Sequence, residues 1–348
     1  MKSKERILRT LELQPIDRVG WVPWVGAHAA HLLGVNAKRL FTEADVLVEG
    51  VLKGYELYQP DGLPTLFDVQ LEAEALGCDI AWSDENPPAV VGHVLEKVEL
   101  SELKIPTPDQ GRYPMALGAA RRIVRELGDR IAIFALITGP FTLTLHLAGV
   151  KIFTDMYDHP DEVKKILSFA SQVCEATARY YAETGVDVIT VVDSLTSQIS
   201  AEHFKTFVTP FHQPILETIH RLGKKSGFFA CGDATRNVEQ MAAIGAHYFG
   251  VDENVDLHFA REVALKHNVA FAGNLPLASV MLFGTPEDNY QAALDCLKAG
   301  GKKGFFLCPG CDIPFATPIE NVQAITRAVR SNEVERLKGN QWSVISDQ

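Results

Sequence analysis

Short apolar runs alternate with helical segments over the last two-thirds of the chain, and this alternation limits the fold more than any other feature. Each run is rich in β-branched and aromatic residues and is bounded by Gly or Asp. The six runs cover residues 131–137, 186–193, 225–232, 247–252, 269–274 and 304–311. The segments between them have apolar residues at a 3.6-residue period and often end at glycine. Strands that are joined through helices pair in parallel, and continuous apolar character indicates burial on both faces.

A closed parallel barrel needs eight strands, so two more are required before residue 131. Apolar runs at 19–25 and 61–68 fill these places, although each contains a proline, which is unfavourable inside a sheet. An open doubly wound sheet is the alternative, but no run is followed by a G-x-G-x-x-G phosphate turn. We therefore predict an α/β fold: one (β/α)₈ TIM-barrel domain over residues 1–348. An N-terminal helical extension is expected at 1–15, and loops with short strands at 78–113.

The charge and hydropathy of the chain exclude several classes of partner. The net charge is −11 over 348 residues, with acidic and basic residues mixed along the sequence. This leaves no basic stripe for nucleic acid or for an anionic membrane surface. There is no run of about 18 apolar residues and no secretory signal pattern at the start. We expect a cytoplasmic enzyme that binds neither nucleic acid nor a membrane.

Catalytic residues of parallel barrels come from the C-terminal ends of the strands and from the loops that follow. Asp193 ends the fourth predicted strand, where its carboxylate is expected to orient substrate or a ligand unless it only caps the surface. Asn274 ends the seventh, where it is expected either to bind substrate or to hold its loop. The full set at this rim is Phe67, Asp68, Thr138, Asp193, Cys231, Asp233, Asp252, Asn274, Cys308 and Cys311.

Two of these strand ends carry cysteine. Cys231 lies in ACGD after the fifth strand, and Cys308 and Cys311 lie in CPGC after the eighth. Thiols that converge on one cavity indicate a soft-ligand metal site, with zinc as the expected metal. The C-x-x-C spacing alone is a weak signal, because Cys308 could end a buried strand and leave only Cys311 accessible. Cys174 and Cys296 fall in apolar helical patterns and are expected to be buried.

Six segments carry a family resemblance, in order and over nearly the whole chain. They are DVQLEAEALGCDIAW (68–82), ITGPFTLTLHLAG (137–149), GVDVITVVDSLTSQISAEHFKTFVTPFHQPI (185–215), FFACGD (228–233), AGNLPLASVMLFGTPE (272–287) and PGCDIPFATPIENVQAI (309–325). These segments resemble the uroporphyrinogen-decarboxylase superfamily, and within it the cobalamin-dependent branch typified by methylcobalamin:coenzyme M methyltransferases. Porphyrinogen decarboxylation is not expected. Residues 24–31 read WVGAHAAH where the decarboxylases have an arginine-rich motif, and four propionates need cationic partners.

The resemblance implies zinc ligands, and one of them is missing. The methyltransferase branch holds zinc through a His-x-Cys pair after the fifth strand and a cysteine after the eighth. Cys231 and Cys311 match both cysteine positions, whereas Phe229 stands at the histidine position and cannot bind metal. The metal shell is therefore expected to be altered or empty. Candidates for the missing ligand are Cys308, His28, His31, Glu72, Glu74 and Asp193.

By resemblance, the chain is expected to be a zinc-dependent methyltransferase. It would move a methyl group between a corrinoid protein, which carries methylcobalamin, and a small thiol or a methoxylated or methylated substrate. No D-x-H-x-x-G motif is present, so cobalamin is expected on the partner. Phe229 would add aromatic surface for substrate if it faces the barrel, which makes an O-demethylase-type reaction an alternative. A metal-free, non-catalytic protein that binds a small molecule is another, and a homodimer is compatible with the sequence.

Overall fold

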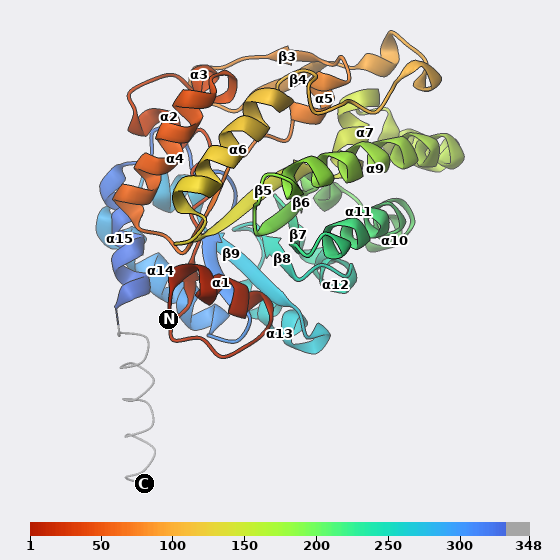
Figure 1. Cartoon of the computed structure of the whole chain (residues 1–348). Coiled ribbons are helices and arrows are strands. Elements are labelled where there is room, and N and C mark those ends of the chain that lie inside the picture. Colours follow the sequence, from red (N-terminus) through yellow and green to blue (C-terminus); the bar gives the residue numbers. More distant parts are fainter. Residues whose placement is uncertain (332–348) are drawn as a thin grey trace.

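Eight parallel strands form a nearly closed barrel in the computed structural model, which describes residues 1–331 (Figure 1). The strand order is β1-β10-β9-β8-β7-β6-β5-β2, and every pairing in this sheet is parallel. The strands are β1 (Gly20–Trp21), β2 (Gly62–Pro64), β5 (Ala132–Thr138), β6 (Val188–Val192), β7 (Lys225–Ala230), β8 (Tyr248–Val251), β9 (Ala270–Leu275) and β10 (Phe305–Pro309). The predicted TIM barrel is confirmed. The predicted single domain also includes residues 332–348, which lie outside the described residues.

The first two strands are shorter than the apolar runs that predicted them. Proline has no N–H group for a strand ladder, and Pro23 and Pro64 fall where β1 and β2 stop. The seam between these strands is closed through Asp61, whose N–H donates to the Trp21 carbonyl at 2.8 Å. Its carboxylate accepts the Trp21 N–H at 2.9 Å and pairs with Arg6.

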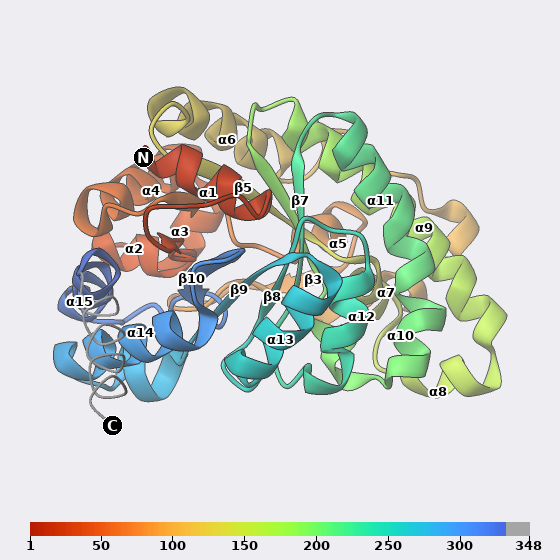
Figure 2. The same cartoon turned by 90° about the horizontal axis from the view of Figure 1, so that it is seen from below.

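Helices surround the strands on all sides (Figure 2). They follow the 3.6-residue apolar period of the sequence, with one face buried against the barrel. Their bounds are α2 (His28–Leu32), α3 (Ala37–Thr42), α4 (Ala44–Tyr58), α5 (Leu71–Ala75), α6 (Tyr113–Leu127), α7 (Pro140–Ala148), α8 (Ile152–Asp158), α9 (Pro160–Ala182), α10 (Ala201–Phe207), α11 (Thr209–Arg221), α12 (Val238–Ala243), α13 (Leu257–His267), α14 (Pro286–Gly300) and α15 (Ile319–Arg330). Short helical turns cover Val94–Glu96, Leu100–Glu102, Ser194–Gln198, Thr235–Asn237 and Leu277–Leu282.

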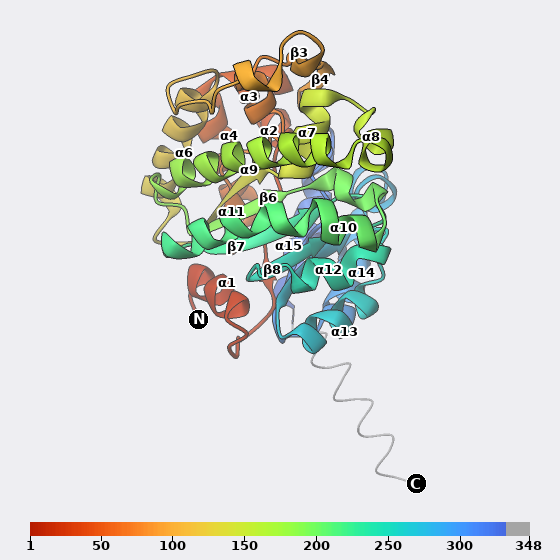
Figure 3. The ribbon, with the colours of Figure 1, turned by 90° about the vertical axis from the view of Figure 1, so that its right-hand side faces the viewer.

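The N-terminal helix α1 (Ser3–Leu11) closes one end of the barrel. Ile7 and Leu11 are buried in the same apolar cluster as the side chains of the barrel interior. The segment 78–113 forms an antiparallel hairpin, β3 (Asp79–Ala81) and β4 (Ala89–Gly92), at the far side of the molecule from α1 (Figure 3). Both features match the sequence-based predictions.

Apolar side chains fill the barrel, so it is a packed core rather than a pore. The interior cluster comprises Val22, Trp24, Phe67, Ala132, Phe134, Leu136, Val188, Val192, Phe229, Tyr248, Ala270, Ala272, Phe306 and Cys308 together with the two residues of α1. Cys231 and Cys311 pack against this cluster and are themselves partly exposed. No helix within residues 1–331 combines the length and apolar character needed to cross a membrane.

Candidate active site at the barrel mouth

Two thiols meet at the C-terminal ends of the strands. Cys231 directly follows β7 and Cys311 lies two residues beyond β10, and their Sγ atoms are 2.9 Å apart. Strands β8 and β9 separate β7 from β10 in the sheet, so this contact crosses the mouth of the barrel. The Ser194 hydroxyl, from the turn after β6, donates to Cys231 Sγ at 3.3 Å. Three strand ends thus contribute to one polar cluster.

The two thiols differ in their surroundings. The hydrogen bond with Cys231 and burial together raise the pKa of Cys311 well above its usual value. Cys311 therefore keeps its proton near neutral pH. The Ser194 O–H donates to Cys231 Sγ, and the two thiols share a second hydrogen bond in which either sulfur can be the donor.

Phe229 faces the barrel interior beneath the thiols. It precedes Cys231 by two residues in chain order, and alternate positions of a strand share one face. Its side chain is 2% exposed, and its ring lies edge-on to that of Trp24 with centroids 6.2 Å apart. The neighbouring Phe228 packs outside the barrel, against Phe204 on α10. Phe229 therefore faces the barrel, where it is packed in the core, and its contact with substrate stays a prediction.

Cys308 lies inside β10, within the interior cluster, and is 0% exposed. Burial raises its pKa far above the usual range, so it keeps its proton. This supports the alternative in which Cys308 ends a buried strand while Cys311 is accessible. Cys174 is fully buried as predicted, whereas Cys296 is partly exposed.

The other proposed metal ligands are engaged elsewhere. His28 lies 2.9 Å from the Phe315 carbonyl through Nδ1 and 2.6 Å from the Tyr58 hydroxyl through Nε2, and burial lowers its pKa to about 4. It is a neutral imidazole with both nitrogens occupied. The carboxylate of Glu72 accepts from the Thr138 N–H and hydroxyl at 3.2 and 2.6 Å.

Glu74 forms an ion pair with Arg112. The ring of His31 stacks on that of His28, with centroids 5.8 Å apart, and meets Phe315 edge-on. Both residues, which lie in the short helices α2 and α5, therefore have partners of their own. Neither is grouped with the thiol pair as a set of metal donors among the described residues.

Asp193 is fully buried and anchors a helix. Its carboxylate accepts the backbone N–H groups of Phe141 and Thr142 at 3.1 and 2.7 Å, in the first turn of α7. His212 Nε2 lies 3.1 Å from the same carboxylate. A negative charge at a helix N-terminus is stabilised by the unpaired N–H groups and the helix dipole. In this arrangement Asp193 positions α7 beside the mouth.

Asn274 holds the loop after β8. Its amide Nδ2 donates to the carbonyls of Asp252 and Val255 at 3.1 and 2.7 Å. This matches the loop-holding alternative for Asn274. Its contact with substrate, like that of Asp193 and Phe229, stays a prediction.

The remaining acidic residues of the rim pair with an arginine or with groups of their own loops. Asp68 pairs with Arg112 at 2.6 Å, Asp252 accepts from Asn254, and Asp233 accepts from the Thr235 N–H. The hydrogen bonds of Asp252 and Asp233 close turns within their own loops.

Asp312, which follows Cys311 in the loop after β10, was not among the residues predicted from the sequence. Burial raises the pKa of its carboxyl to about 8, so it is a neutral acid near pH 7. Oδ2 accepts the Ala27 N–H at 3.1 Å, whereas Oδ1 is buried without a hydrogen-bond partner. In a sequence, an aspartate after a Gly-Cys pair is typical of an exposed loop. Its burial depends on the loop after β1, which is remote in sequence.

The donor set does not fit a protein zinc site. Such a site takes three or four protein ligands, and two thiolates 2.3 Å from tetrahedral zinc are roughly 3.8 Å apart. The described part of the chain contains no group of three His, Cys, Asp or Glu side chains placed to hold a metal ion. The two sulfurs, at 2.9 Å, are also closer than a tetrahedral site requires.

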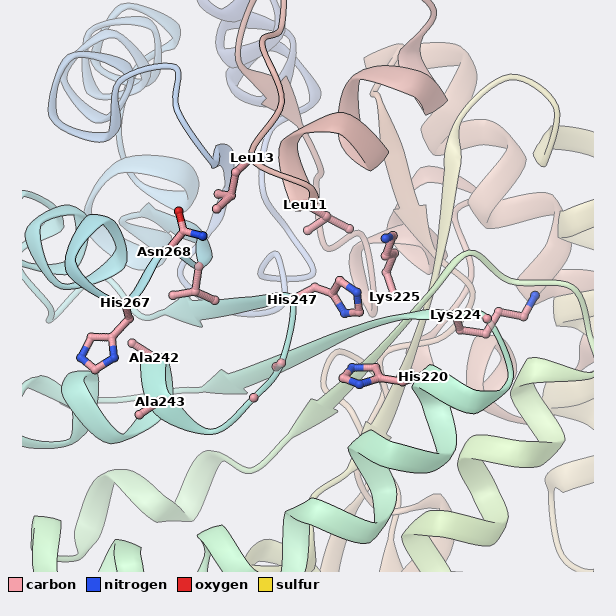
Figure 4. A pocket seen from close by; sticks show the side chains of 14 residues that line it. Leu11, Leu13, His220, Lys224, Lys225, Ala242, Ala243, His247, His267 and Asn268 are labelled. Atoms are coloured by element: carbon pink, nitrogen blue, oxygen red, sulfur yellow. The ribbon is translucent and has the colours of Figure 1, made fainter.

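A cavity of about 840 Å³ lies at the opposite end of the barrel, beside α1 (Figure 4). Its lining includes His220, Lys225, His247 and His267. Helices α11, α12 and α13 end at this cavity, and basic side chains there complement the negative ends of the helix dipoles. Barrel enzymes bind and convert their substrates at the C-terminal ends of the strands, which is the other end of the barrel. This cavity is therefore not the active site.

Comparison with known proteins finds methyltransferases and uroporphyrinogen decarboxylases among the relatives of this chain. Methylcobamide:CoM methyltransferase MtbA of Methanosarcina acetivorans is 27% identical, over 94% of this chain and 97% of the relative. The methylated-thiol–coenzyme M methyltransferase of Methanosarcina mazei is 26% identical over 84% and 79%. Uroporphyrinogen decarboxylase of Trichodesmium erythraeum is 24% identical over 80% of each chain.

A solved structure of a methyltransferase from Methanosarcina mazei superposes with a TM-score of 0.86 at 24% identity, covering 95% of this chain and 98% of that one. This likeness confirms the fold. The named relatives are methyltransferases and decarboxylases, so the chain is an enzyme of that kind. Residues 2–332 match the family described as Uroporphyrinogen decarboxylase (URO-D), and the chain belongs to this family, as its sequence motifs predicted.

Proposed function

We propose that this enzyme is a methyltransferase that moves a methyl group between a corrinoid protein and a small thiol or a methylated or methoxylated substrate. The observation that carries the proposal is the pair of thiols, Cys231 and Cys311, 2.9 Å apart at the catalytic end of the barrel. The names of the relatives support the same chemistry, since they include methyltransferases that act with methylcobamides and coenzyme M.

The structure limits how the reactants reach the thiols. Trp24, Phe229 and Cys308 fill the barrel directly below the pair and are nearly inaccessible. Substrate and the corrinoid partner must therefore approach from the mouth. The apolar floor excludes water from that side, which protects a reactive methyl carrier from hydrolysis.

The direction of transfer determines which electron pair moves. With a thiol acceptor, the thiolate sulfur forms the new bond to carbon, and cobalt keeps the pair of the broken cobalt–carbon bond. With a methylated donor, reduced cobalt supplies the electron pair of the new cobalt–carbon bond. The oxygen or sulfur of the donor leaves with the electron pair of its broken bond to carbon. Phe229 and Trp24 are packed beneath the thiols and offer substrate almost no surface, so O-demethylation stands as the alternative to thiol methylation without support from this pair.

Zinc dependence is a separate prediction. Bound zinc would lower the pKa of a thiol or polarise an oxygen, and Cys231 and Cys311 would supply two of its ligands. Because the described residues provide no third donor, the proposed transfer rests on the thiol pair alone. Association as a homodimer and a cytoplasmic location also stay predictions, which light scattering and cell fractionation would test.

The test is methyl transfer by the purified chain, followed through the spectrum of the corrinoid. Methylcobalamin with a panel of small thiols probes one direction, and reduced corrinoid with methoxylated aromatic compounds probes the other. Cys231→Ser and Cys311→Ser should each lower the rate at least about 100-fold, within the range seen when reacting groups are removed. Cys296→Ser, on helix α14 outside the barrel, should retain it. Equal rates in all three variants would overturn the proposal.

The missing third donor favours a second candidate, a metal-free protein that binds a small molecule without turnover. Elemental analysis and calorimetry separate the two. Less than about a tenth of an equivalent of zinc, no transfer in either direction and saturable binding of a methoxylated aromatic compound would support the second candidate.

A further inference from the structure

The contact between Cys231 and Cys311 allows chemistry beyond methyl transfer. We propose that these two cysteines close reversibly into a disulfide bond across the barrel mouth, so that the pair is a site of oxidative modification. The sulfurs are 2.9 Å apart and need to approach by about 0.9 Å to reach the roughly 2.05 Å of a disulfide. Both residues lie beyond the ends of their strands, so this approach leaves the ladders of β7 and β10 intact.

The surroundings of the pair favour oxidation of Cys231 first. Its sulfur accepts a hydrogen bond from the Ser194 hydroxyl, and it is partly exposed at the mouth. Solvent access is one of the factors that determine which cysteine a peroxide attacks. Cys311 is then already in place as the resolving thiol.

The reaction balances with a hydroperoxide as oxidant. The Cys231 thiolate attacks one oxygen of hydrogen peroxide, the O–O bond breaks, and the products are a sulfenic acid and hydroxide, which takes the thiol proton to become water. The sulfur of Cys311 then attacks the sulfenic sulfur, the S–O bond breaks, and a second water leaves with the Cys311 proton. Two thiols lose two electrons and two protons, and one peroxide becomes two waters.

No other cysteine competes for either partner. Cys78, Cys174 and Cys308 are buried. The Sγ of Cys296 faces Asn274 at 3.9 Å. The described residues also provide no third donor that would hold the pair as metal thiolates. Both thiols are therefore available to each other.

The functional consequence rests on the proposed methyl transfer. A disulfide withdraws both sulfurs from the reaction, so the oxidised enzyme should be inactive and should recover on reduction. The covalent change itself is measurable without any activity assay, which keeps the two proposals separable.

The experiment uses the full chain, titrated with hydrogen peroxide, alkylated and mapped by mass spectrometry of unreduced peptides. Free thiols should fall from six to four, with one peptide pair joining Cys231 to Cys311, and dithiothreitol should restore all six. Cys296→Ala, and Cys308→Ala if circular dichroism shows it folded, should form the same bond. Cys311→Ser should instead stop at an oxidised Cys231, and Ser194→Ala should slow the reaction several-fold.

Two outcomes would overturn the disulfide. One is six free thiols after exposure to peroxide that fully oxidises dithiothreitol, even if methyl transfer is present. The other is a bond between Cys308 and Cys311. A Cys231–Cys311 disulfide in a protein that transfers no methyl group would support this inference and reject the proposed function.

Discussion

Asp312 occupies the space in front of Gly26, where a Cβ at residue 26 would stand only 1.8 Å from the carboxyl oxygen Oδ1. The other oxygen accepts the Ala27 N–H at 3.1 Å, and the Ile313 N–H donates to the Trp24 carbonyl at 2.9 Å. These contacts join the loop after the first barrel strand to the loop after the last. They fix the backbone on both sides of Asp312, immediately beyond Cys311.

Gly26→Ala should therefore disturb the thiol pair without touching it. The new methyl group cannot share space with Oδ1, so Asp312 and its loop must shift, at a cost of about 1–3 kcal/mol in the free energy of unfolding. Urea denaturation measures the cost, and peroxide titration should show slower closure of Cys231 with Cys311. The control is Gly118→Ala in α6, where nothing lies within 4 Å and stability should be equal or slightly higher. Equal stability of both variants would contradict the packing argument.

Asp193→Ala should be strongly destabilising, because it removes the acceptor for two N–H groups of α7 and the carboxylate beside His212. We expect a loss of about 2–4 kcal/mol in the free energy of unfolding. Asp233→Ala, at the exposed end of the next strand, should lose less than about 0.5 kcal/mol. A double-mutant cycle with His212→Ala should give a coupling energy that is clearly different from zero. Additive effects would show that the two side chains act independently.

Phe229→His should create zinc binding. Position 229 faces the barrel interior two residues before Cys231, so an imidazole there would stand beside the thiol pair. Elemental analysis should give more zinc for this variant than for the unmodified protein, approaching about one equivalent per chain. Phe228→His is the matched control, because that side chain points out of the barrel toward Phe204 and should bring no metal. Stoichiometric zinc in the unmodified protein would show that other donors complete the site.

Glu72→Gln should change how stability depends on pH. Burial raises the pKa of Glu72 to about 7 from an ordinary value of 4.5. A carboxyl with a raised folded pKa contributes stability that is complete below its unfolded pKa and is lost as the pH rises through about 7. The variant has no such titrating group. Its free energy of unfolding should therefore rise relative to that of the unmodified protein between about pH 5 and pH 8. The gain should reach up to about 3 kcal/mol.

Thermal or urea denaturation across this pH range measures the difference in unfolding free energy for Glu72→Gln. The carboxyl of Asp312 also has a raised pKa, but it is present in both proteins and cancels in the comparison. Exposed Glu287→Gln is the control and should show a flat difference. A flat difference for Glu72→Gln as well would indicate that this side chain is ionised throughout.

The sequence by itself determined the barrel and its family. The strand segments could be predicted because burial on both faces makes them continuously apolar, and the helices because only one face is buried. The two strands that contain proline were placed correctly but predicted too long, since the loss of ladder N–H groups shortens them. Cys231 and Cys311 could be placed at one rim because the C-terminal ends of parallel strands share one end of the barrel.

Only the tertiary structure decided which side chains meet. The sequence allowed Asp193 to bind substrate, but the position of α7 places two N–H groups against it. It also left open whether Cys308 joins the pair, and the direction of its side chain in β10 keeps it in the core. Asp312 was missed because Gly26, nearly three hundred residues earlier, provides the space that buries it. Strand ends follow from local patterns, whereas donors and partners depend on contacts between distant loops.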